Sequence, residues 1–381
     1  MTPGLLLRGT APFLSPALVD LADVVVRRAA ALTIDDHDAS SVARKLAASG
    51  LFPLLVPERD GGEAIAGAPV DRPSVRALCL ARETLGHRSP LADSIFAVQG
   101  LGSFPIVSAG GDARAAILAE VVSGKRIGAF ALTEPEAGSD VASMKTTAKR
   151  EGDGFVIDGT KVFISNAGIC DHYVVFARVP GAPKEISAFV VPAKSPGLRV
   201  EQVPMSLPHP LGRLVFERCA VPASALLGEV GHGMRLALGT LDVFRTSVGA
   251  AACGMARRAL DETIARVKAR VQFGKPLAEQ QLVQAQIADM ATELDAARLL
   301  VYRAAWEKDR GEPATTDVAM AKMFATEAAQ RIIDRAVQLF GGLGVTTGNV
   351  PEQLLREIRP LRIYEGTTEI QKLIIGGAIL K

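Results

Sequence analysis

A carboxylate beside a glycine near the C-terminus is the group in this sequence most able to do chemistry. Residues 363–370 read IYEGTTEI and place Glu365 directly before Gly366. A carboxylate that removes a proton from carbon works best when partial burial raises its pKa, and the apolar Ile363 and Tyr364 could supply that burial. Glycine lets a ligand approach the backbone closely. Glu365 is therefore a candidate general base.

The same stretch also has the pattern of a turn between two helices. Thr367 can cap the N-terminus of a following helix, and Glu369 in its first turn favours the helix dipole. On these residues alone, the turn and the base remain open alternatives.

The composition indicates a globular chain without a polyanionic partner. The 381 residues are 48% hydrophobic and 22% charged, enough to bury the cores of two or three domains. The 43 basic and 41 acidic residues are spread evenly and give a net charge of +2, which disfavours nucleic acid as a partner.

Cysteines, histidines and apolar runs point to a cytoplasmic protein. The 4 cysteines lie far apart, which indicates neither a disulfide scaffold nor a cysteine metal site. The 5 histidines, among them His172 and His209, lack metal-ligand spacing, so we expect no metal site and predict that the histidines are solvated or in turns. No uninterrupted apolar run reaches the ~18 residues of a membrane span, and no signal peptide pattern opens the chain. We expect no membrane association.

The periodicity of apolar residues divides the chain into three parts. Short helices are predicted over 16–33, 40–50, 74–87, 91–100 and 112–123. In the third of these helices, Arg82 interrupts the apolar side, and we expect it to extend to water. Short β-like runs follow between about 127 and 227, and long helical patterns begin near 233. The predicted domains are a helical domain over 1–126, a β domain over 127–230 and a helical bundle over 231–381.

A polar loop after a strand-like run is a second candidate for chemistry. Residues 130–140 read FALTEPEAGSD, and such a turn presents backbone N–H groups and hydroxyls to an electron-rich ring or a carbonyl. As a bare pattern it is only a polar loop.

This loop and five further motifs, in the same order along the chain, resemble the acyl-CoA dehydrogenase family. The others are GTKVFISNA at 159–167, LVFE at 214–217 with VP at 221–222 and LGE at 227–229, RVQFGKPL at 270–277, QLFGGLG at 338–344, and IYEGTTEI itself. The chain departs from the family where Phe163 replaces a common Trp, where Val345 replaces a frequent aromatic residue, and at Gly376 and Gly377, where the family usually has Ala-Arg.

The resemblance implies a fold, a cofactor and partners. The fold is mainly α with a central β domain: an N-terminal helical domain, a middle β-barrel domain and a C-terminal four-helix bundle. The cofactor is FAD, held between the β domain and the bundle with part of the site from a second subunit, so a homodimer or homotetramer is expected. The substrate is an acyl-CoA, and an electron-transfer flavoprotein or similar acceptor removes the electrons.

The resemblance also assigns residues by position. It implies one catalytic residue, Glu365. The residues implied to contact FAD are Leu132, Thr133, Gly138, Ser139, Phe163, Ile164, Ser165, Arg270, Phe273, Gln281, Gln338, Gly341, Gly342, Thr367 and Glu369. Those implied to contact the substrate are Ser139, Asp242, Arg245 and Gly366. Arg270 would pair with the pyrophosphate of a neighbouring subunit's cofactor. For Asp242 and Arg245, the alternative to substrate contact is a buried ion pair within the helix.

The activity implied is α,β-dehydrogenation of an acyl-CoA thioester to a trans-2-enoyl-CoA. Some family members carry the base at the position of Phe244, and because phenylalanine cannot serve, Glu365 is the candidate that remains. A flavin-dependent oxygenase and a non-catalytic member of the family are the alternatives. The region around Ser94, Phe96 and Ala97 corresponds to the floor of the acyl pocket, and the acyl chain length stays open.

Overall fold

The structure, a computed structural model, describes residues 1–2, 4, 7–110, 112–182 and 184–381. The chain forms two compact units, each assembled from segments that are far apart in sequence. The helical unit contains Met1–Ala30, Val75–Asp93 and Arg245–Lys381, and the β unit contains Ala31–Ser74 and Ser94–Phe244. The predicted boundaries at 126 and 230 follow the sequence texture instead, and they stay a prediction.

The helical unit is built on long helices. They are α2 (Pro16–Ala30), α4 (Val75–Arg88), α7 (Gly233–Ala269, of which the residues from 245 belong here), α8 (Gln281–Asp309), α9 (Thr315–Phe340), α10 (Val350–Ile358) and α11 (Thr368–Ile379). Helix α9 packs against α8, α10 and α11. Its buried side is rich in alanine, for example Ala321, Ala325 and Ala329, and such small side chains let neighbouring helices approach closely. On α7, a Cβ at Gly249 would lie 2.7 Å from Cγ2 of Val301 on α8, so only glycine fits there.

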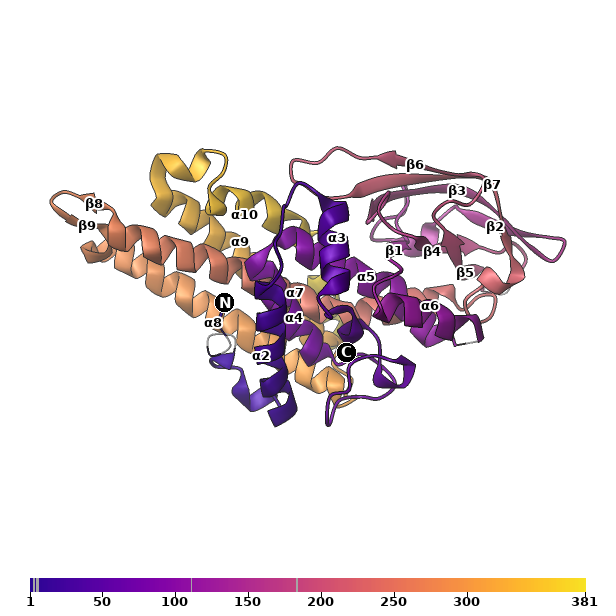
Figure 1. Cartoon of the computed structure of the whole chain (residues 1–381), viewed down its shortest axis with the longest axis horizontal. Helices are drawn as coiled ribbons and strands as arrows, with labels where there is room; N and C mark the ends of the chain where they lie inside the picture. Colours follow the sequence, from indigo (N-terminus) through magenta and orange to yellow (C-terminus); the bar gives the residue numbers. More distant parts are fainter. Residues whose placement is uncertain (3, 5–6, 111, 183) are drawn as a thin grey trace. The chain divides into compact units, whose positions relative to one another are not determined.

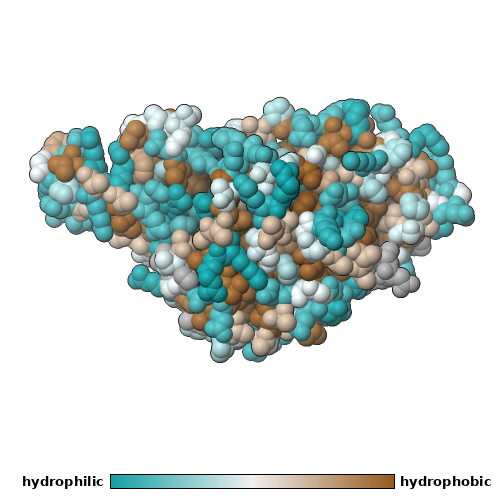
Figure 2. Space-filling view, in the orientation of Figure 1, coloured by the Kyte–Doolittle hydropathy of each residue, from teal (hydrophilic) through white to brown (hydrophobic). Residues whose placement is uncertain are grey.

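A two-stranded hairpin joins α7 to α8. Strands β8 (Val271–Gln272) and β9 (Lys275–Pro276) pair in antiparallel register, and the hairpin lies at the far ends of these helices (Figure 1). Apolar side chains are exposed at this end, among them Val271, Phe273 and Leu282 (Figure 2). The hairpin therefore presents an apolar surface that the helical unit itself does not cover.

The prediction that Arg82 extends to water is wrong. Its side chain is only 1% exposed, and its Nε and Nη2 each donate to a carboxylate oxygen of Asp93 at 2.9 Å. Nη1 donates to the hydroxyl of Ser247 at 3.1 Å. A guanidinium can be buried when its donors find partners in the interior, and here the partners come from the start of α5 and from α7.

The β unit contains a sheet of 7 strands within the described residues. The strands are β1 (Gly128–Ala131), β2 (Thr147–Glu151), β3 (Gly154–Ser165), β4 (His172–Arg178), β5 (Ile186–Pro192), β6 (Leu198–Gln202) and β7 (Leu211–Pro222). Their order is β1-β4-β2-β3-β7-β6, with β5 on β4. The sheet is curled (Figure 1). Ring pairs such as Phe130 with Phe176 and Phe155 with Phe189 pack in its core.

Three helices also belong to the β unit. They are α3 (Ala39–Ala48), α5 (Pro90–Ala109, of which the residues from 94 belong here) and α6 (Asp112–Val122). Helix α5 is long and apolar enough to cross a membrane, but 89% of its most apolar window is buried inside the protein. Such burial is typical of a core helix. The mainly helical fold with a central β domain is thus confirmed, and the early helices lie within a few residues of their predicted positions except for α5, which runs nine residues further.

A bulge near the end of β3 reorients one predicted site residue. The register of β3 against β7 shifts between Lys161 and Ile164, and Phe163 within this shift has a φ of 57°. A bulge of this kind turns a side chain out of the regular alternation of the strand. Phe163 is 64% exposed, whereas Ile164 beside it is buried.

Candidate active site

Backbone strain is concentrated at predicted site residues. Within the described part of the chain, 5 residues other than glycine have a positive φ, and Phe163, Phe273 and Glu365 are three of them. The left-handed conformation costs such residues about 1–2 kcal/mol, and strain of this kind clusters at functional sites because the surroundings must hold it in place. The backbone therefore singles out three positions that the sequence motifs had indicated.

In the β unit, the predicted flavin-contacting residues come from two adjacent segments. Leu132, Thr133, Gly138 and Ser139 lie on the loop after β1, and Phe163, Ile164 and Ser165 end β3. The N–H of Val162 donates to the carbonyl of Thr133 at 2.9 Å, which joins the two segments. The loop glycine and serine are exposed, Thr133 is half-buried and Leu132 is buried.

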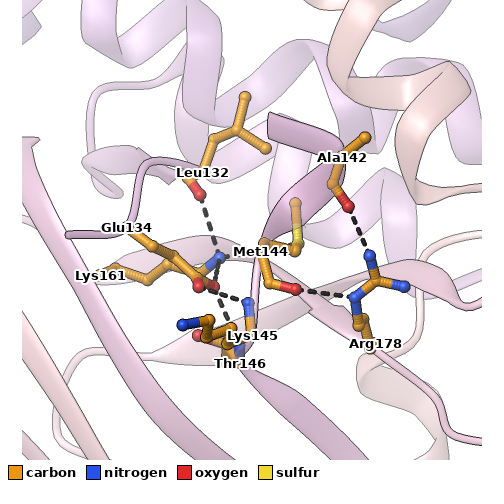
Figure 3. Close-up of polar contacts among 8 residues, drawn as sticks. All are labelled: Leu132, Glu134, Ala142, Met144, Lys145, Thr146, Lys161 and Arg178. Carbon is orange, nitrogen blue, oxygen red and sulfur yellow. Dashed lines mark hydrogen bonds and ion pairs between the residues drawn. The ribbon is translucent and has the colours of Figure 1, made fainter. Parts of the chain in front are cut away.

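A buried ion pair beneath this loop holds it in place (Figure 3). Nζ of Lys161 donates to Oε1 of Glu134 at 2.8 Å and to the carbonyl of Leu132 at 3.0 Å. The Glu134 carboxylate in turn accepts from the backbone N–H groups of Lys145 at 2.5 Å and Thr146 at 3.0 Å. The pair therefore ties the start of the loop to its end.

Burial and pairing act in opposite directions on this ion pair. Burial disfavours the ammonium and lowers the pKa of Lys161 to about 8, although Glu134 acts in the opposite direction. For Glu134, burial raises the pKa, but the Lys161 charge and the hydrogen bonds to its carboxylate outweigh burial and lower it overall. The pair is charged at neutral pH, and neither group is available as a catalytic acid or base.

A histidine links two further parts of the β unit. Nε2 of His209 lies 2.8 Å from the Ser165 hydroxyl, and its Nδ1 lies 3.3 Å from the hydroxyl of Ser94 on α5. Burial lowers the pKa of His209 to about 4, so its imidazole is neutral at pH 7. A second histidine, His172, is fully buried, and its Nε2 lies 3.2 Å from the carbonyl oxygen of Gly102. The prediction that the histidines are solvated or in turns is wrong for His172, which is buried on β4, whereas His209 is half-buried in the loop between β6 and β7.

In the helical unit, Glu365 lies on a turn that precedes α11. Glu365 and Gly366 have φ angles of 53° and 91°. Thr367 caps α11 by accepting from the N–H of Ile370 at 3.3 Å, so the turn predicted from the sequence is real and Glu365 is part of it. The two alternatives for this stretch are therefore compatible.

One oxygen of the Glu365 carboxylate, Oε2, is buried without a hydrogen-bond partner among the described residues. Burial raises the pKa of Glu365, as the sequence predicts, while the nearby charges of Arg82, Arg245 and Lys322 oppose this rise. Ile363 contributes little to the burial because it is largely exposed. The group combines the raised pKa and the free acceptor oxygen that a general base needs.

Three side chains hold the carbonyl groups of the Glu365 turn. Nε of Arg245 donates to the carbonyl of Glu365 at 2.9 Å. Lys322 and Gln371 donate to the carbonyl of Gly366 at 2.8 and 2.9 Å. The structure thus brings the predicted substrate residues Arg245 and Gly366 together with Glu365. Glu369 follows on the exposed side of α11, and Asp242 lies in the β unit.

The predicted adenine-end residues form a second group in the helical unit. Arg270 and Phe273 lie on the β8–β9 hairpin and Gln281 begins α8, whereas Gln338 is near the end of α9 and Gly341 and Gly342 follow it. Nη2 of Arg266 donates to the carbonyl of Phe340 at 3.1 Å, which ties the end of α7 to the end of α9. All six predicted residues are exposed, and Phe273 is 95% exposed.

Sequence reasoning missed the side chains that support these groups. Lys161, His209 and Lys322 touch predicted site residues, yet none was singled out as a site residue. The available signal was a lysine within an apolar strand or helix, since lysine is almost never fully buried unless it is paired. Their partners could not be read from local pattern.

The exposed features fit a large planar cofactor with phosphate groups. Phe163 offers an exposed aromatic face beside a loop of hydroxyls and N–H groups. Arg270 and Phe273 offer an exposed cation and an exposed ring on the hairpin. These residue types suit an isoalloxazine ring and an adenosine pyrophosphate, and they agree with FAD.

Comparisons with known proteins define the class. Residues 129–219 match the acyl-CoA dehydrogenase middle domain, and residues 231–380 match the acyl-CoA dehydrogenase C-terminal domain. The chain is 38% identical to the human mitochondrial short-chain specific acyl-CoA dehydrogenase over 89% of this chain and 82% of the relative. The butyryl-CoA dehydrogenase of Megasphaera elsdenii superposes with a TM-score of 0.88 at 33% identity, over 97% of this chain and 99% of the other.

A glutaryl-CoA dehydrogenase of Mycobacterium smegmatis, solved with FADH2, superposes with a TM-score of 0.88 at 27% identity, over 99% of this chain and 98% of the other. Fold and sequence together define a flavin-dependent oxidoreductase. The chain belongs to the acyl-CoA dehydrogenase family. It is an enzyme that uses FAD to dehydrogenate an acyl-CoA thioester and passes the electrons to a separate carrier.

Proposed function

We propose that Glu365 is the catalytic base that removes the α-proton of the acyl-CoA substrate. The observation that carries this proposal is the buried Oε2 on a left-handed turn, which no described residue contacts by a hydrogen bond and whose group has a pKa that burial raises. A carboxylate paired with a cation would be a weaker base, whereas this oxygen is open to accept a proton. Phe244, at the alternative position of the base, is buried and apolar.

The residues of the chain then have distinct tasks in the reaction. The Glu365 carboxylate takes the proton at Oε2, and the backbone N–H of Glu365 donates to the thioester oxygen, where negative charge grows. Bound FAD would supply the acceptor for the β-hydride of the acyl chain, which the formation of a trans-2-enoyl thioester requires. Arg82, Arg245 and Lys322 oppose the rise in the pKa of Glu365 that burial causes, and so favour the ionised carboxylate.

We propose that FAD binds the two groups of exposed residues described above. The isoalloxazine ring contacts the loop after β1 and the end of β3, at Leu132, Thr133, Gly138, Ser139, Phe163, Ile164 and Ser165. The pyrophosphate and adenine end binds the second group, which consists of Arg270, Phe273, Gln281, Gln338, Gly341 and Gly342. Thr367 and Glu369 are the remaining residues proposed to contact FAD. The exposure of Phe163 and Phe273 on strained backbone supports this assignment, because a bound ligand would cover both rings.

The acyl group is proposed to be short or compact. Phe244 is buried against α5, where a Cβ on Gly100 would lie 2.2 Å from Cε1 of its ring. Phe104 packs against the same ring with centroids 6.1 Å apart, and Phe96 on α5 is buried as well. Bulky rings along the helix proposed as the pocket floor favour a shallow pocket. The human relative acts on short chains by its name, in agreement with this proposal.

Partners and location follow from the surface and the cysteines. We propose a homodimer or homotetramer, because a second copy of the chain could cover the exposed apolar side chains at two places. They are Val271 and Phe273 on the hairpin with Leu282 at the start of α8, and Leu373 on α11 with Leu380 just after it. An electron-transfer flavoprotein is the proposed carrier. All 4 cysteines are free and buried, which supports a reducing compartment, and we propose the cytoplasm.

Anaerobic bleaching of the flavin by a panel of acyl-CoA thioesters tests this function. We expect short and compact acyl groups to reduce the flavin fastest. Glu365→Gln should retain FAD and bind substrate with similar affinity, but reduce the flavin at least ~100-fold more slowly. Near-normal reduction by Glu365→Gln would exclude it as the base. Rapid oxygen consumption by the reduced enzyme would indicate the oxygenase alternative.

A further inference from the structure

Lys322 is a buried cation whose ammonium faces backbone oxygen. It lies on α9 with its side chain 0% exposed, and Nζ donates to the carbonyl of Gly366 at 2.8 Å. Burying an ammonium is costly unless nearby groups compensate for its lost hydration. Among the charged groups that affect Lys322, the largest attraction comes from Glu365, ahead of Glu327 and Glu369. The lysine is therefore directed at the turn that carries the proposed base.

The geometry of that turn needs external support. Glu365 is left-handed, which costs a residue with a side chain about 1–2 kcal/mol. Its carbonyl accepts from Arg245, and the next carbonyl accepts from both Lys322 and Gln371. These donors come from three different helices, α7, α9 and α11, and together they fix two successive peptide groups.

The direction of the Glu365 carboxylate depends on this backbone. No described residue forms a hydrogen bond with Oε2, so among these residues no hydrogen bond orients that oxygen. The orientation follows instead from the φ of Glu365 and the packing around it. A change in the turn would therefore move the oxygen that is proposed to accept the proton, and misplacement of a catalytic group by about 1 Å can cost a factor of about 100 in rate.

We propose that Lys322 is a positioning residue of the active site, which holds the Glu365–Gly366 turn through the Gly366 carbonyl and supplies a positive charge that keeps the Glu365 carboxylate ionised. This inference rests on the proposed role of Glu365 as the base. Lys322 itself transfers no proton and touches no substrate.

Substitution can separate the hydrogen bond that Lys322 donates from the positive charge that it carries. Lys322→Met keeps the length of the side chain but removes both the donor and the charge. Lys322→Gln removes the charge and retains an N–H donor for the carbonyl. Lys372→Met on α11 is the matched control, because it removes an exposed lysine from the same C-terminal region.

The test measures flavin reduction against pH in the FAD-loaded proteins, together with the affinity for an unreactive acyl-CoA analogue. We expect Lys322→Met to slow flavin reduction by about 10- to 100-fold, the range expected for one lost hydrogen bond to a charged group. Analogue affinity should stay within about threefold of the original. We expect Lys322→Gln to lose less rate than Lys322→Met, and Lys372→Met to match the unchanged protein.

The pH profile distinguishes positioning from a purely structural role. Glu365 is faced by Arg82, Arg245 and Lys322, and by Asp93 with the opposite effect. Removing one cation disfavours the carboxylate, so the pH at which the rate rises should move upward by about one unit in both Lys322 variants. A profile identical to that of the unchanged protein would overturn the proposal, as would loss of FAD and of folding in both variants.

Failure of this inference is distinguishable from failure of the proposed function. If Glu365→Gln is inactive while both Lys322 variants keep the original rate and pH profile, the base is correct and Lys322 is not a positioning residue. If Glu365→Gln retains turnover, the base itself is wrong, and the role proposed for Lys322 is refuted with it.

Discussion

The buried pair of Lys161 and Glu134 makes a quantitative prediction about the loop proposed to contact the flavin. Lys161→Met leaves the Glu134 carboxylate buried without its cation, a change that typically costs about 3–5 kcal/mol. Two backbone N–H groups still donate to this carboxylate, so we expect the lower end, about 3 kcal/mol of unfolding free energy. Glu134→Gln should relieve part of that loss, because the remaining neutral oxygen can still accept from the backbone.

A double-mutant cycle measures the coupling between the two side chains. The single variants Lys161→Met and Glu134→Gln and the double variant are unfolded in urea with FAD in fixed excess, because ligand binding adds to the stability of the folded state. Circular dichroism and flavin fluorescence should be followed together, since a chain of two units need not unfold in one step. We expect the double variant to be more stable than the sum of the single losses by about 1–3 kcal/mol. Additivity within about 0.5 kcal/mol would refute the buried pair as described.

The pH dependence of stability gives a second check on the same pair. The pKa of Lys161 falls from 10.5 in the unfolded chain to about 8 in the folded protein, so the unfolded chain binds more protons between these values. Unfolding free energy therefore rises with pH across that window, and Lys161→Met should remove the rise. The lowered pKa of Glu134 acts on the acid side, where its contribution is lost as the pH falls through its folded value.

Two further predictions concern the Glu365 turn and His209. Gly366→Ala places a Cβ 2.5 Å from Nε2 of Gln371 at a φ of 91°, so we expect at least a ~10-fold loss in the rate of flavin reduction; Gly61→Ala, with a φ of 89° and no atom within 4 Å, should leave this rate unchanged. His209 has a pKa of about 4 in the folded protein against 6.5 in the unfolded chain, so the free energy of unfolding falls as the pH is lowered from 6.5 to 4. His209→Gln should therefore make the melting temperature less dependent on pH across this range. An unchanged pH dependence would contradict the shielding of His209 from solvent.

Local pattern was sufficient to predict most of the elements. The helix predicted over 74–87 is observed at Val75–Arg88, and the β-like runs fall on the strands of the sheet. Helical and extended periodicity arise from neighbouring residues, so they are visible in a short window of sequence. The cap at Thr367 was read correctly for the same reason, because a capping hydroxyl bonds an N–H three residues ahead. The end of α5 was missed, since that helix continues through Pro105.

The partners of buried charges could not be predicted from local pattern. Nη1 of Arg82 bonds a serine 165 positions away, and Arg298 bonds Glu83 across 215 positions. A charged side chain within an apolar helix gives no sign of which distant group will satisfy it. Without that knowledge, extension to solvent was the reasonable expectation for Arg82, and it was wrong.

The sequence by itself determined which residues are available for chemistry: an ordered set of motifs, a glutamate before a glycine, and an apolar residue at the alternative position of the base. Only the tertiary structure decided the state of that glutamate. Its pKa depends on burial and on cations from α4, α7 and α9, and its direction depends on a left-handed turn whose carbonyls are held by three helices. Electrostatic and steric effects act through space, so residues remote in sequence set the properties of the site.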